Sequence, residues 1–399
     1  MKNKILLMIA FLVIVLFINI SVGEAKEVRG VTGTSIKIGV SMDQTGPASS
    51  LLVQLTQAVR TYTKYINDSG GVNGRHLEII VEDDRYSIPA ALAGFKKLVF
   101  RDKVFTFTGP SSASLIFVLW KHIQKNKLPS ISAPFTEIAI NPLKKYLFIV
   151  CDTYEGQTRV IVDYMLKDHK LGEPRVGLVY PDTEAGKTDL RAALPRLEKY
   201  NVTPVTKEIM MAGALDATSQ VMNLRKHKAN CILNIGTFTA TTVTLLRDMR
   251  KFGLKIPVFN TFGAMLGEEL NQIGEAANQV YSVHSTAPWY GEGPGVAKMR
   301  KITLKYHPGT EKPYRGTIYA HGWAIATVMI EGLKRAGRKL NEDQFIRALE
   351  SIRNYDMGGI SNPVTFSSSN HKGGDSWRIY KADPVGGKYA AITEWRKSD

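Results

Sequence analysis

The sequence contains little of what metal-binding and disulfide-rich proteins require. Among its 399 residues there are only two cysteines and eight histidines. The histidines are scattered, with no pair at the spacing of zinc ligands, so no metal site is predicted. Cys151 and Cys231 lie in or beside apolar, strand-like runs and are far apart in the chain. This setting favours two buried free thiols over a disulfide, although sequence alone does not decide between them.

The short motifs of common enzyme classes are also absent. The chain has no G-x-S-x-G elbow, no P-loop, no H-E-x-x-H and no cysteine–histidine signature. Gly291, Gly293 and Gly295 lack the strand-to-helix context of a dinucleotide site and predict a loop. Asp83 and Asp84 follow a strand and precede a helix, which favours a capping role over metal or acid–base chemistry. We therefore expect a protein that is not an enzyme and uses no cofactor.

Only one apolar run is long enough to concern a membrane. Residues 5–17 are all apolar, Lys2 and Lys4 precede them, and the small residues Gly23 and Ala25 follow. This order predicts a signal peptide over residues 1–25, cleaved near Ala25, and export to the periplasm. An uncleaved anchor is the alternative because the run is long for a signal peptide. No cysteine lies near residue 25, so a lipid anchor is not indicated.

Negative charge is in deficit, since 52 lysines and arginines face 36 acidic residues, for a formal net charge of +16. The excess is dispersed in pairs such as Lys96 and Lys97, and no basic run is interleaved with aromatic residues. A solvated surface is therefore favoured over a field that attracts anionic ligands or membranes. The signal segment and the lack of a helix-turn-helix before Ile36 disfavour a bilobed DNA-binding repressor.

What the chain does contain is a clear strand–helix–strand unit at residues 70–114. Residues 77–81 form a short apolar run, Pro89 stands where a helix begins, and residues 104–108 are rich in β-branched and aromatic side chains. The second strand runs directly into the sequence GPSSAS at residues 109–114. Because ligands bind at the carboxyl ends of strands in open parallel sheets, this hydroxyl-rich loop is the first candidate site.

Strands and helices alternate in the same way through residue 284, which predicts an α/β fold with parallel sheets covered on both faces. A chain of this length, 44% hydrophobic, is too long for one compact core and suggests two lobes. Residues 319–333 predict a long apolar helix in which Gly322 lets a neighbour approach. Residues 363–366 and 377–381 suggest a terminal hairpin.

Five segments, taken in order, carry a family resemblance: IKIGVSMDQTGP at 36–47, NDSGGVNGRHLEIIVE at 67–82, GPSSAS at 109–114, YEGQ at 154–157 and YRGTIYAHGWAIATVMIEGLKRAG at 314–337. Together they resemble the periplasmic substrate-binding proteins of the branched-chain amino acid (Leu/Ile/Val-binding protein) ABC transporter type. The resemblance implies an α/β fold of two Rossmann-like lobes joined by a three-strand hinge. It also implies a discontinuous division, with lobe 1 at 33–152 plus 285–370 and lobe 2 at 153–284 plus 371–399.

The resemblance places the ligand's carboxylate on the serine loop, at Ser111, Ser112 and Ser114. Hydroxyls and free N–H groups at a helix N-terminus suit an anion, although Ser112 or Ser114 can instead cap the helix, or do both. The next matching contacts are Phe135, which can stack on a ligand, and Thr136, which can donate from its hydroxyl and N–H. A core or capping role is the alternative for Phe135.

At the first lobe junction the resemblance singles out Tyr154, for which ligand contact and hinge packing are equally open. In lobe 2 it assigns Phe238 to an aromatic wall of the site. Ala185 departs from the family pattern, because relatives often carry a tyrosine there, and that contact is therefore in doubt.

The most informative departure is Phe262, which stands where amino-acid binders have a glutamate that holds the ligand's ammonium group. A buried cation without a counter-charge is costly. Unless Glu268, Asp43 or another carboxylate takes this role, an α-amino acid is disfavoured. The expected ligand is then a small organic acid with an aromatic or branched aliphatic body.

These features predict an extracytoplasmic solute-binding protein that closes on a small carboxylate-bearing ligand and delivers it to the permease of an ABC transporter. We expect a monomer that binds no nucleic acid. Two alternatives remain: a ligand-sensing module that docks on a membrane sensor, and a true branched-chain amino acid binder. A neighbouring transporter gene or sensor gene would separate uptake from sensing.

Overall fold

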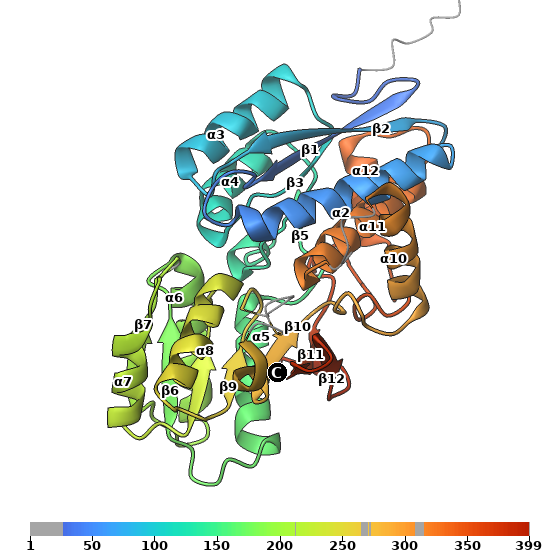
Figure 1. Cartoon of the computed structure of the whole chain (residues 1–399). Coiled ribbons are helices and arrows are strands. Elements are labelled where there is room, and N and C mark those ends of the chain that lie inside the picture. Colours follow the sequence, from blue (N-terminus) through green and yellow to red (C-terminus); the bar gives the residue numbers. More distant parts are fainter. Residues whose placement is uncertain (1–26, 212, 265–269, 271–272, 308–314, 399) are drawn as a thin grey trace, which may run out of the picture.

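The computed structural model describes residues 27–398 except 212, 265–269, 271–272 and 308–314. The expected signal segment and Glu268 therefore lie outside the described residues. Within those ranges, no helix combines the length and the apolar character needed to cross a bilayer. The chain forms two lobes, each built on a β-sheet flanked by helices (Figure 1). This confirms the expected α/β class and its two lobes.

The first lobe is built on a five-stranded, wholly parallel sheet. In sheet order its strands are β2 (His76–Asp83), β1 (Ser35–Met42), β3 (Thr106–Thr108), β4 (Ser130–Ile131) and β5 (Leu147–Phe148). Its central strands are buried on both faces, as their unbroken apolar runs predict. The parallel pairing brings the carboxyl ends of all five strands to one edge of the sheet, and the serine loop follows β3 there.

Helices from distant parts of the chain cover this sheet. They are α2 (Ser49–Asp68), α3 (Ile88–Lys96, continued by a π-helical turn, Lys97–Arg101), α4 (Ala113–Lys125), α10 (Pro294–Tyr306), α11 (Thr317–Ala336) and α12 (Glu342–Glu350). In Figure 1 the orange α10, α11 and α12 lie beside the blue α2, and α10 and α11 pack on it. The chain therefore returns to the first lobe after building most of the second.

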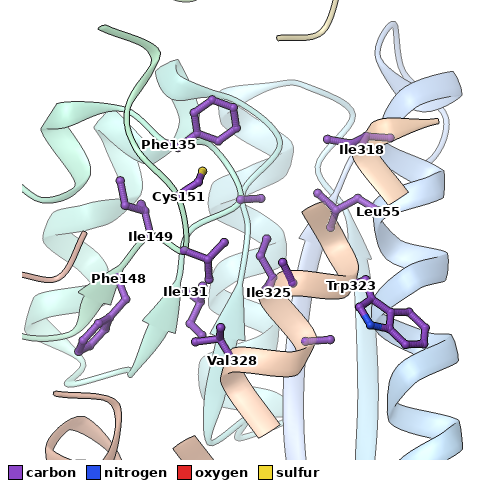
Figure 2. Close-up of a cluster of buried hydrophobic side chains, with 14 of the residues drawn as sticks. Leu55, Ile131, Phe135, Phe148, Ile149, Cys151, Ile318, Trp323, Ile325 and Val328 are labelled. Carbon is purple, nitrogen blue, oxygen red and sulfur yellow. The ribbon is translucent and has the colours of Figure 1, made fainter. Parts of the chain in front are cut away.

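Helix α11 is the centre of the first lobe's core. Ile318, Trp323, Ile325 and Val328 are each 4% exposed or less, because α11 is enclosed by α2 on one side and the sheet on the other (Figure 2). Burying each such side chain contributes about 1.5–3 kcal/mol. Gly322 allows the close approach to α2, since a Cβ there would lie 2.6 Å from a backbone carbonyl oxygen. The predicted role of this glycine is confirmed.

The second lobe has an eight-stranded sheet with a parallel body and an antiparallel edge. Its path is β12 (Lys388–Ala391), β11 (Ser376–Asp383), β10 (Val280–His284), β9 (Val258–Asn260), β8 (Cys231–Asn234), β6 (Val176–Tyr180) and β7 (Thr206–Ile209), with β13 (Arg396–Lys397) paired to β11. Among the described residues, the helices that accompany it are α5 (Tyr154–Asp163), α6 (Glu184–Glu198), α7 (Thr218–Lys226) and α8 (Thr239–Lys251). The strands from β6 to β10 pair in parallel, whereas β11 runs antiparallel to β10 and β12.

The terminal hairpin has a different partner from the one expected, so that part of the sequence interpretation is wrong. β11 pairs with β12 through a turn in which Asp383 accepts a hydrogen bond from the Gly386 N–H at 2.9 Å. Val364 instead forms an isolated bridge with Tyr355. Phe366 is buried and packs against Phe148. This apolar contact places the segment around Phe366 in the first lobe. Strand propensity alone does not predict which lobe such a segment packs against.

The chain passes between the two sheets three times: after β5, after β10 and before β11. The first and third crossings are hydrogen-bonded to each other, because the Ile149 N–H donates to the His371 carbonyl (3.0 Å) and the Gly373 N–H donates to the Ile149 carbonyl (2.8 Å). Asp152 of the first crossing pairs with Lys372 of the third at 2.7 Å. This arrangement agrees with the expected three-strand hinge, while the boundary numbers given for the lobes stay predictions.

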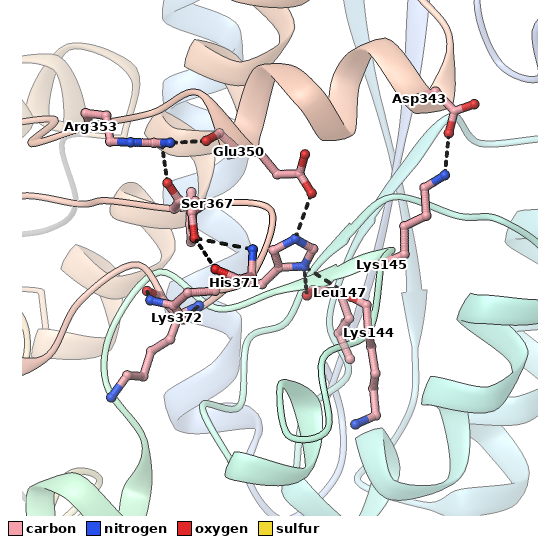
Figure 3. A network of polar contacts seen from close by, with 12 residues as sticks. Lys144, Lys145, Leu147, Asp343, Glu350, Arg353, Ser367, His371 and Lys372 are labelled. Carbon is pink, nitrogen blue, oxygen red and sulfur yellow. Dashed lines mark hydrogen bonds and ion pairs between the residues drawn. The ribbon is translucent and has the colours of Figure 1, made fainter.

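His371 anchors the third crossing to the first lobe (Figure 3). Its ring stacks on Phe148 with centroids 3.7 Å apart. Its Nδ1 lies 3.1 Å from the carbonyl oxygens of Lys144 and Leu147. Its Nε2 faces Glu350 of α12 at 3.2 Å. One imidazole thus links the crossing, the edge of the sheet and the last helix of the lobe.

Candidate functional site

A cavity lies between the two lobes, at the edge where the carboxyl ends of their parallel strands meet. Its walls come from the loops after β2, β3, β4, β8 and β9 and from the helices α2, α5, α6 and α11. The lining residues are Leu51, Leu52, Leu55, Tyr86, Ser111, Ser112, Ala113, Ala133, Pro134, Phe135, Tyr154, Ala185, Asp189, Gly236, Thr237, Phe238, Phe262, Gly263 and Ile318. Apolar and aromatic side chains dominate, with a few polar groups among them, as in a small-molecule site.

The serine loop forms part of this lining and also caps a helix. The Ser112 hydroxyl accepts a hydrogen bond from the Leu115 N–H at 3.3 Å, and it lies 3.0 Å from the Ser114 hydroxyl. The Ser111 hydroxyl accepts from the Asp43 N–H at 2.5 Å. Ser111 and Ser112 line the cavity, whereas Ser114 is outside the lining, in the first turn of α4. The loop is thus held in place by its own polar contacts.

Tyr86 covers the serine loop and was not identified from the sequence. Tyr86 and Arg85 both have a positive φ, 55° and 49°, a conformation that is costly for residues with a side chain. Asp83 and Asp84 hold this pair, since the Arg85 N–H donates to Asp83 and the Tyr86 N–H donates to Asp84, both at 3.0 Å. Burial raises the pKa of Tyr86 to about 12, and its hydroxyl contacts Ser112. The acidic pair therefore positions an aromatic wall of the cavity.

Phe135 is the centre of an aromatic cluster beneath the cavity. Its ring centroid lies 4.2 Å from that of Tyr154, 4.9 Å from Phe262 and 5.2 Å from His321. It is 1% exposed, so it is at once a core residue and part of the cavity wall. Thr136 is outside the lining, where it is the N-cap residue of a 3₁₀ turn. The Tyr154 N–H donates to the Phe135 carbonyl at 2.9 Å, which fixes the start of α5 beside the cluster.

Two aromatic residues complete the wall contributed by the second lobe. The Phe238 ring meets the Tyr86 ring of the first lobe edge-on, with centroids 6.1 Å apart. The Phe262 N–H donates to the Gln157 side chain at 2.7 Å, and its ring lies 4.7 Å from that of His284. Burial lowers the pKa of His284 to about 3, so this imidazole is neutral. The side of the cavity near Phe262 therefore presents rings and no cation.

Asp189 of α6 is the second cavity residue that sequence reasoning missed. It is 1% exposed, and its carboxylate accepts hydrogen bonds from the Thr158 hydroxyl (2.9 Å) and the Thr261 hydroxyl (3.1 Å). Burial, with a smaller contribution from the nearby Glu155, raises its pKa to about 7. No apolar period or local motif singles out this residue within a largely polar helix. Its role becomes visible only when α5, α6 and the segment after β9 are brought together.

Of the carboxylates weighed from the sequence as replacements for the missing glutamate, Asp43 is already used. It accepts from the Gly46 N–H (2.5 Å) and the Ala48 N–H (2.8 Å) and lies outside the cavity lining. Glu268 lies outside the described residues. Within the described ranges, no cluster of three or more His, Cys, Asp and Glu is placed to hold a metal ion. Both cysteines are buried and free, as expected.

A family model described as periplasmic binding protein matches residues 35–388. The chain belongs to the periplasmic binding protein family. Among curated relatives, this periplasmic binding protein is 22% identical to the "Amino acid binding protein" of Pseudomonas aeruginosa, over 88% of the chain and 91% of the relative. It is 21% identical to the "Leu/Ile/Val-binding protein homolog 3" of Brucella melitensis, over 87% and 91%.

Solved structures share the fold over nearly the whole chain. A branched-chain amino acid ABC transporter protein of Thermus thermophilus with bound valine superposes with a TM-score of 0.84 at 22% identity, covering 92% of this chain and 98% of that one. A fatty acid ABC transporter substrate-binding protein of Thermomonospora curvata gives 0.81 at 23% identity, covering 94% and 95%. These two neighbours are titled for different ligands, so the likeness establishes the fold and leaves the ligand open.

The structure brings most of the predicted site residues of this periplasmic binding protein to one place. Six of the eight line the cavity, namely Ser111, Ser112, Phe135, Tyr154, Phe238 and Phe262. Ser114 and Thr136 flank it without lining it. It stays a prediction that any of these eight residues contacts a ligand. Ala185, where the resemblance leads one to expect a tyrosine, also lines the wall.

Proposed function

We propose that the protein is an extracytoplasmic solute-binding protein that captures a small organic molecule in the cavity between its lobes. It acts without catalysis and passes the molecule to the permease of an ABC transporter. The observation that carries the proposal is that both lobes contribute residues to the cavity wall. Loops at the carboxyl ends of both sheets supply it, so a molecule held there contacts both lobes.

Contact with both lobes is what couples binding to hinge closure. A ligand shifts the open–closed equilibrium only by its differential affinity for the closed form, and a ligand that touches both walls has that differential. Tyr86 of the first lobe and Phe238 of the second meet across the cavity. This pair supports a closed arrangement in which the ligand is shielded from solvent, and the hinge is supplied by the three crossings.

The lining favours a ligand with an apolar body of branched or aromatic character. Leu52 and Ile318 face the cavity from the first lobe, and Phe238 and Phe262 from the second. A carboxylate on such a ligand has a place at the serine loop, where Ser112 stands at the N-terminus of α4. The solved structures with this fold include a complex with valine and a fatty acid binder, which agree with a small molecule that combines these two parts.

The partner and the location follow from the same proposal. The apolar segment at residues 5–17 supports export to the periplasm with cleavage near Ala25. The titles of the neighbours name ABC transporters, which supports a permease as the membrane partner. The protein acts as a monomer that presents its closed form to that permease.

Small-angle X-ray scattering on the chain purified after removal of residues 1–25 tests capture and closure together. We expect mass spectrometry to find a small molecule bound to the protein as isolated. We also expect the radius of gyration to increase when that molecule is removed by unfolding and refolding. Tyr86→Ala is expected to weaken rebinding and Tyr86→Phe to preserve most of it, because the phenyl ring keeps the contact with Phe238. A protein that carries no small molecule and keeps one shape refutes the proposal.

A further inference from the structure

The cavity has an uneven balance of charge. Of the described residues that line it, Asp189 is the one with a carboxylate, and none is a lysine, an arginine or a histidine. The groups that stabilise the ionised form of Asp189 are the hydroxyls of Thr158 and Thr261 and the Gln157 side chain, and none of them is a cation. A second carboxylate, that of Glu155, is close enough to raise the pKa of Asp189 further. When Asp189 is ionised, its charge therefore has no cationic partner among the described residues that line the cavity.

A carboxylate in this position is costly to keep for structural reasons alone. Taking an ionised group out of water costs several kcal/mol unless a partner of opposite charge compensates. Linking two threonine hydroxyls does not require a charge, because an amide side chain of the same shape also bonds to hydroxyls. A carboxylate has about four acceptor sites, and the two threonine hydroxyls together with the Gln157 side chain occupy at most three of those of Asp189. Asp189 thus has the capacity to accept a donor from inside the cavity.

We infer that Asp189 is the residue that determines the ligand's charge, by accepting a protonated amine or similar cationic donor from the ligand. This inference rests on the proposed function. It replaces the sequence-based expectation of a simple organic acid, which assumed that no carboxylate substitutes for the one missing at Phe262. A ligand whose only charge is a carboxylate meets Asp189 with like charge and is rejected. A ligand with an amine next to an apolar body neutralises Asp189 and remains compatible with the serine loop.

Three probes that share one apolar body test this directly. L-Leucine carries both charges, 4-methylpentanoate carries the carboxylate alone, and 3-methylbutylamine carries the amine alone. Calorimetric titration of the ligand-free protein at pH 8 is expected to show leucine binding at least tenfold more tightly than 4-methylpentanoate. The same comparison with L-phenylalanine, 3-phenylpropanoate and 2-phenylethylamine covers an aromatic body. An acid that binds as tightly as its amino acid overturns the inference and leaves the proposed function standing.

The variant Asp189→Asn removes the charge and preserves the shape. It is expected to abolish the tenfold preference. The matched control is Asp248→Asn, because Asp248 is also a buried carboxylate of the second lobe, where it accepts the Ala217 N–H at 2.7 Å outside the cavity. The control is expected to retain the preference even where it lowers stability. A preference that survives Asp189→Asn overturns the inference.

The direction of the pH dependence separates ligand recognition from a purely structural role. Between pH 6 and pH 8 Asp189 loses its proton, so the affinity for the amine probes is expected to rise about tenfold. Glu155 of α5 has a pKa raised by burial to about 7 and titrates in the same range, whereas Tyr86 and Tyr154 have pKa values raised by burial above it. Asp189→Asn keeps Glu155, so a pH dependence lost in this variant belongs to Asp189. An unchanged profile overturns the inference.

If none of the six probes binds, the molecule that co-purifies with the protein decides. A captured molecule with a basic nitrogen supports the inference, and one without overturns it. A protein that captures nothing contradicts the proposed function itself, and the inference about Asp189 falls with it.

Discussion

Substituting Asp189 by asparagine should make the ligand-free protein more stable at neutral and alkaline pH. The pKa of this carboxyl rises from 3.8 to about 7 on folding, chiefly because burial penalises the ionised form. The folded state therefore binds more protons than the unfolded state between these two values, and stability falls as pH rises through that window. Below pH 3.8 the penalty is absent, and above pH 7 it reaches its full size of about 4 kcal/mol.

The measurable quantity is the change in this penalty across an accessible range. Between pH 5 and pH 8 it grows by about 2 to 3 kcal/mol. Denaturation by guanidinium chloride of ligand-free wild type and Asp189→Asn at the two pH values gives the difference in unfolding free energy. We expect that difference to shift in favour of the variant by this amount. The contribution of Glu155 cancels apart from its coupling to Asp189, because both proteins contain it. A variant less stable than wild type at pH 8, or a difference independent of pH, refutes the reasoning.

Three further outcomes are expected. In thermal melts, Gly322→Ala should lower the free energy of unfolding by about 1–3 kcal/mol, because the added Cβ would lie 2.6 Å from the Leu55 carbonyl oxygen. The control Gly33→Ala should be neutral, because a Cβ at residue 33 meets no atom within 4 Å. Asp152→Ala should cost about 3 kcal/mol in denaturant unfolding, because it removes the carboxylate that neutralises Lys372 at 2.7 Å; an unchanged midpoint would contradict this account. Both cysteine thiols should resist Ellman's reagent in the native protein and react fully after unfolding, because they are buried and burial raises their pKa values.

The parts of the fold that the sequence predicted well are those governed by local periodicity. The strand–helix–strand unit around Pro89 appears as expected because each of its elements has its own apolar pattern and its own end signals. The return of α10, α11 and α12 to the first lobe is different. This return depends on which part of the protein the apolar face of α11 packs against. Periodicity predicts that a helix has a buried face, but it does not predict the partner of that face. That expectation came from the family resemblance and not from the residues themselves.

The same distinction explains the outcome for the candidate site. Ser112 was found because its signal is local: a strand, a hydroxyl and a helix follow one another in the chain. Tyr86 was missed because its signal is the backbone conformation that Asp83 and Asp84 impose, and the sequence showed these two acids only as a cap at the end of a strand. Thr136 was assigned by matching a family position, yet its segment turns away into a short helix.

The charge of the cavity shows the limit of reading a site one position at a time. The family resemblance places Phe262 where amino-acid binders carry an acid, and from that position alone an amine-bearing ligand was disfavoured. However, the electrostatic potential in a pocket depends on every charged group that lines it. Asp189 lines the same cavity from α6, whereas Phe262 lies in the segment after β9. Opposite charges attract across several ångströms in a poorly solvated space. The attraction between a carboxylate and a cationic ligand group therefore depends on the distance between them more than on which strand or helix supplies the carboxylate. Phe262 and Asp189 should therefore be considered together, because both line the same cavity and either position can supply or withhold a negative charge there.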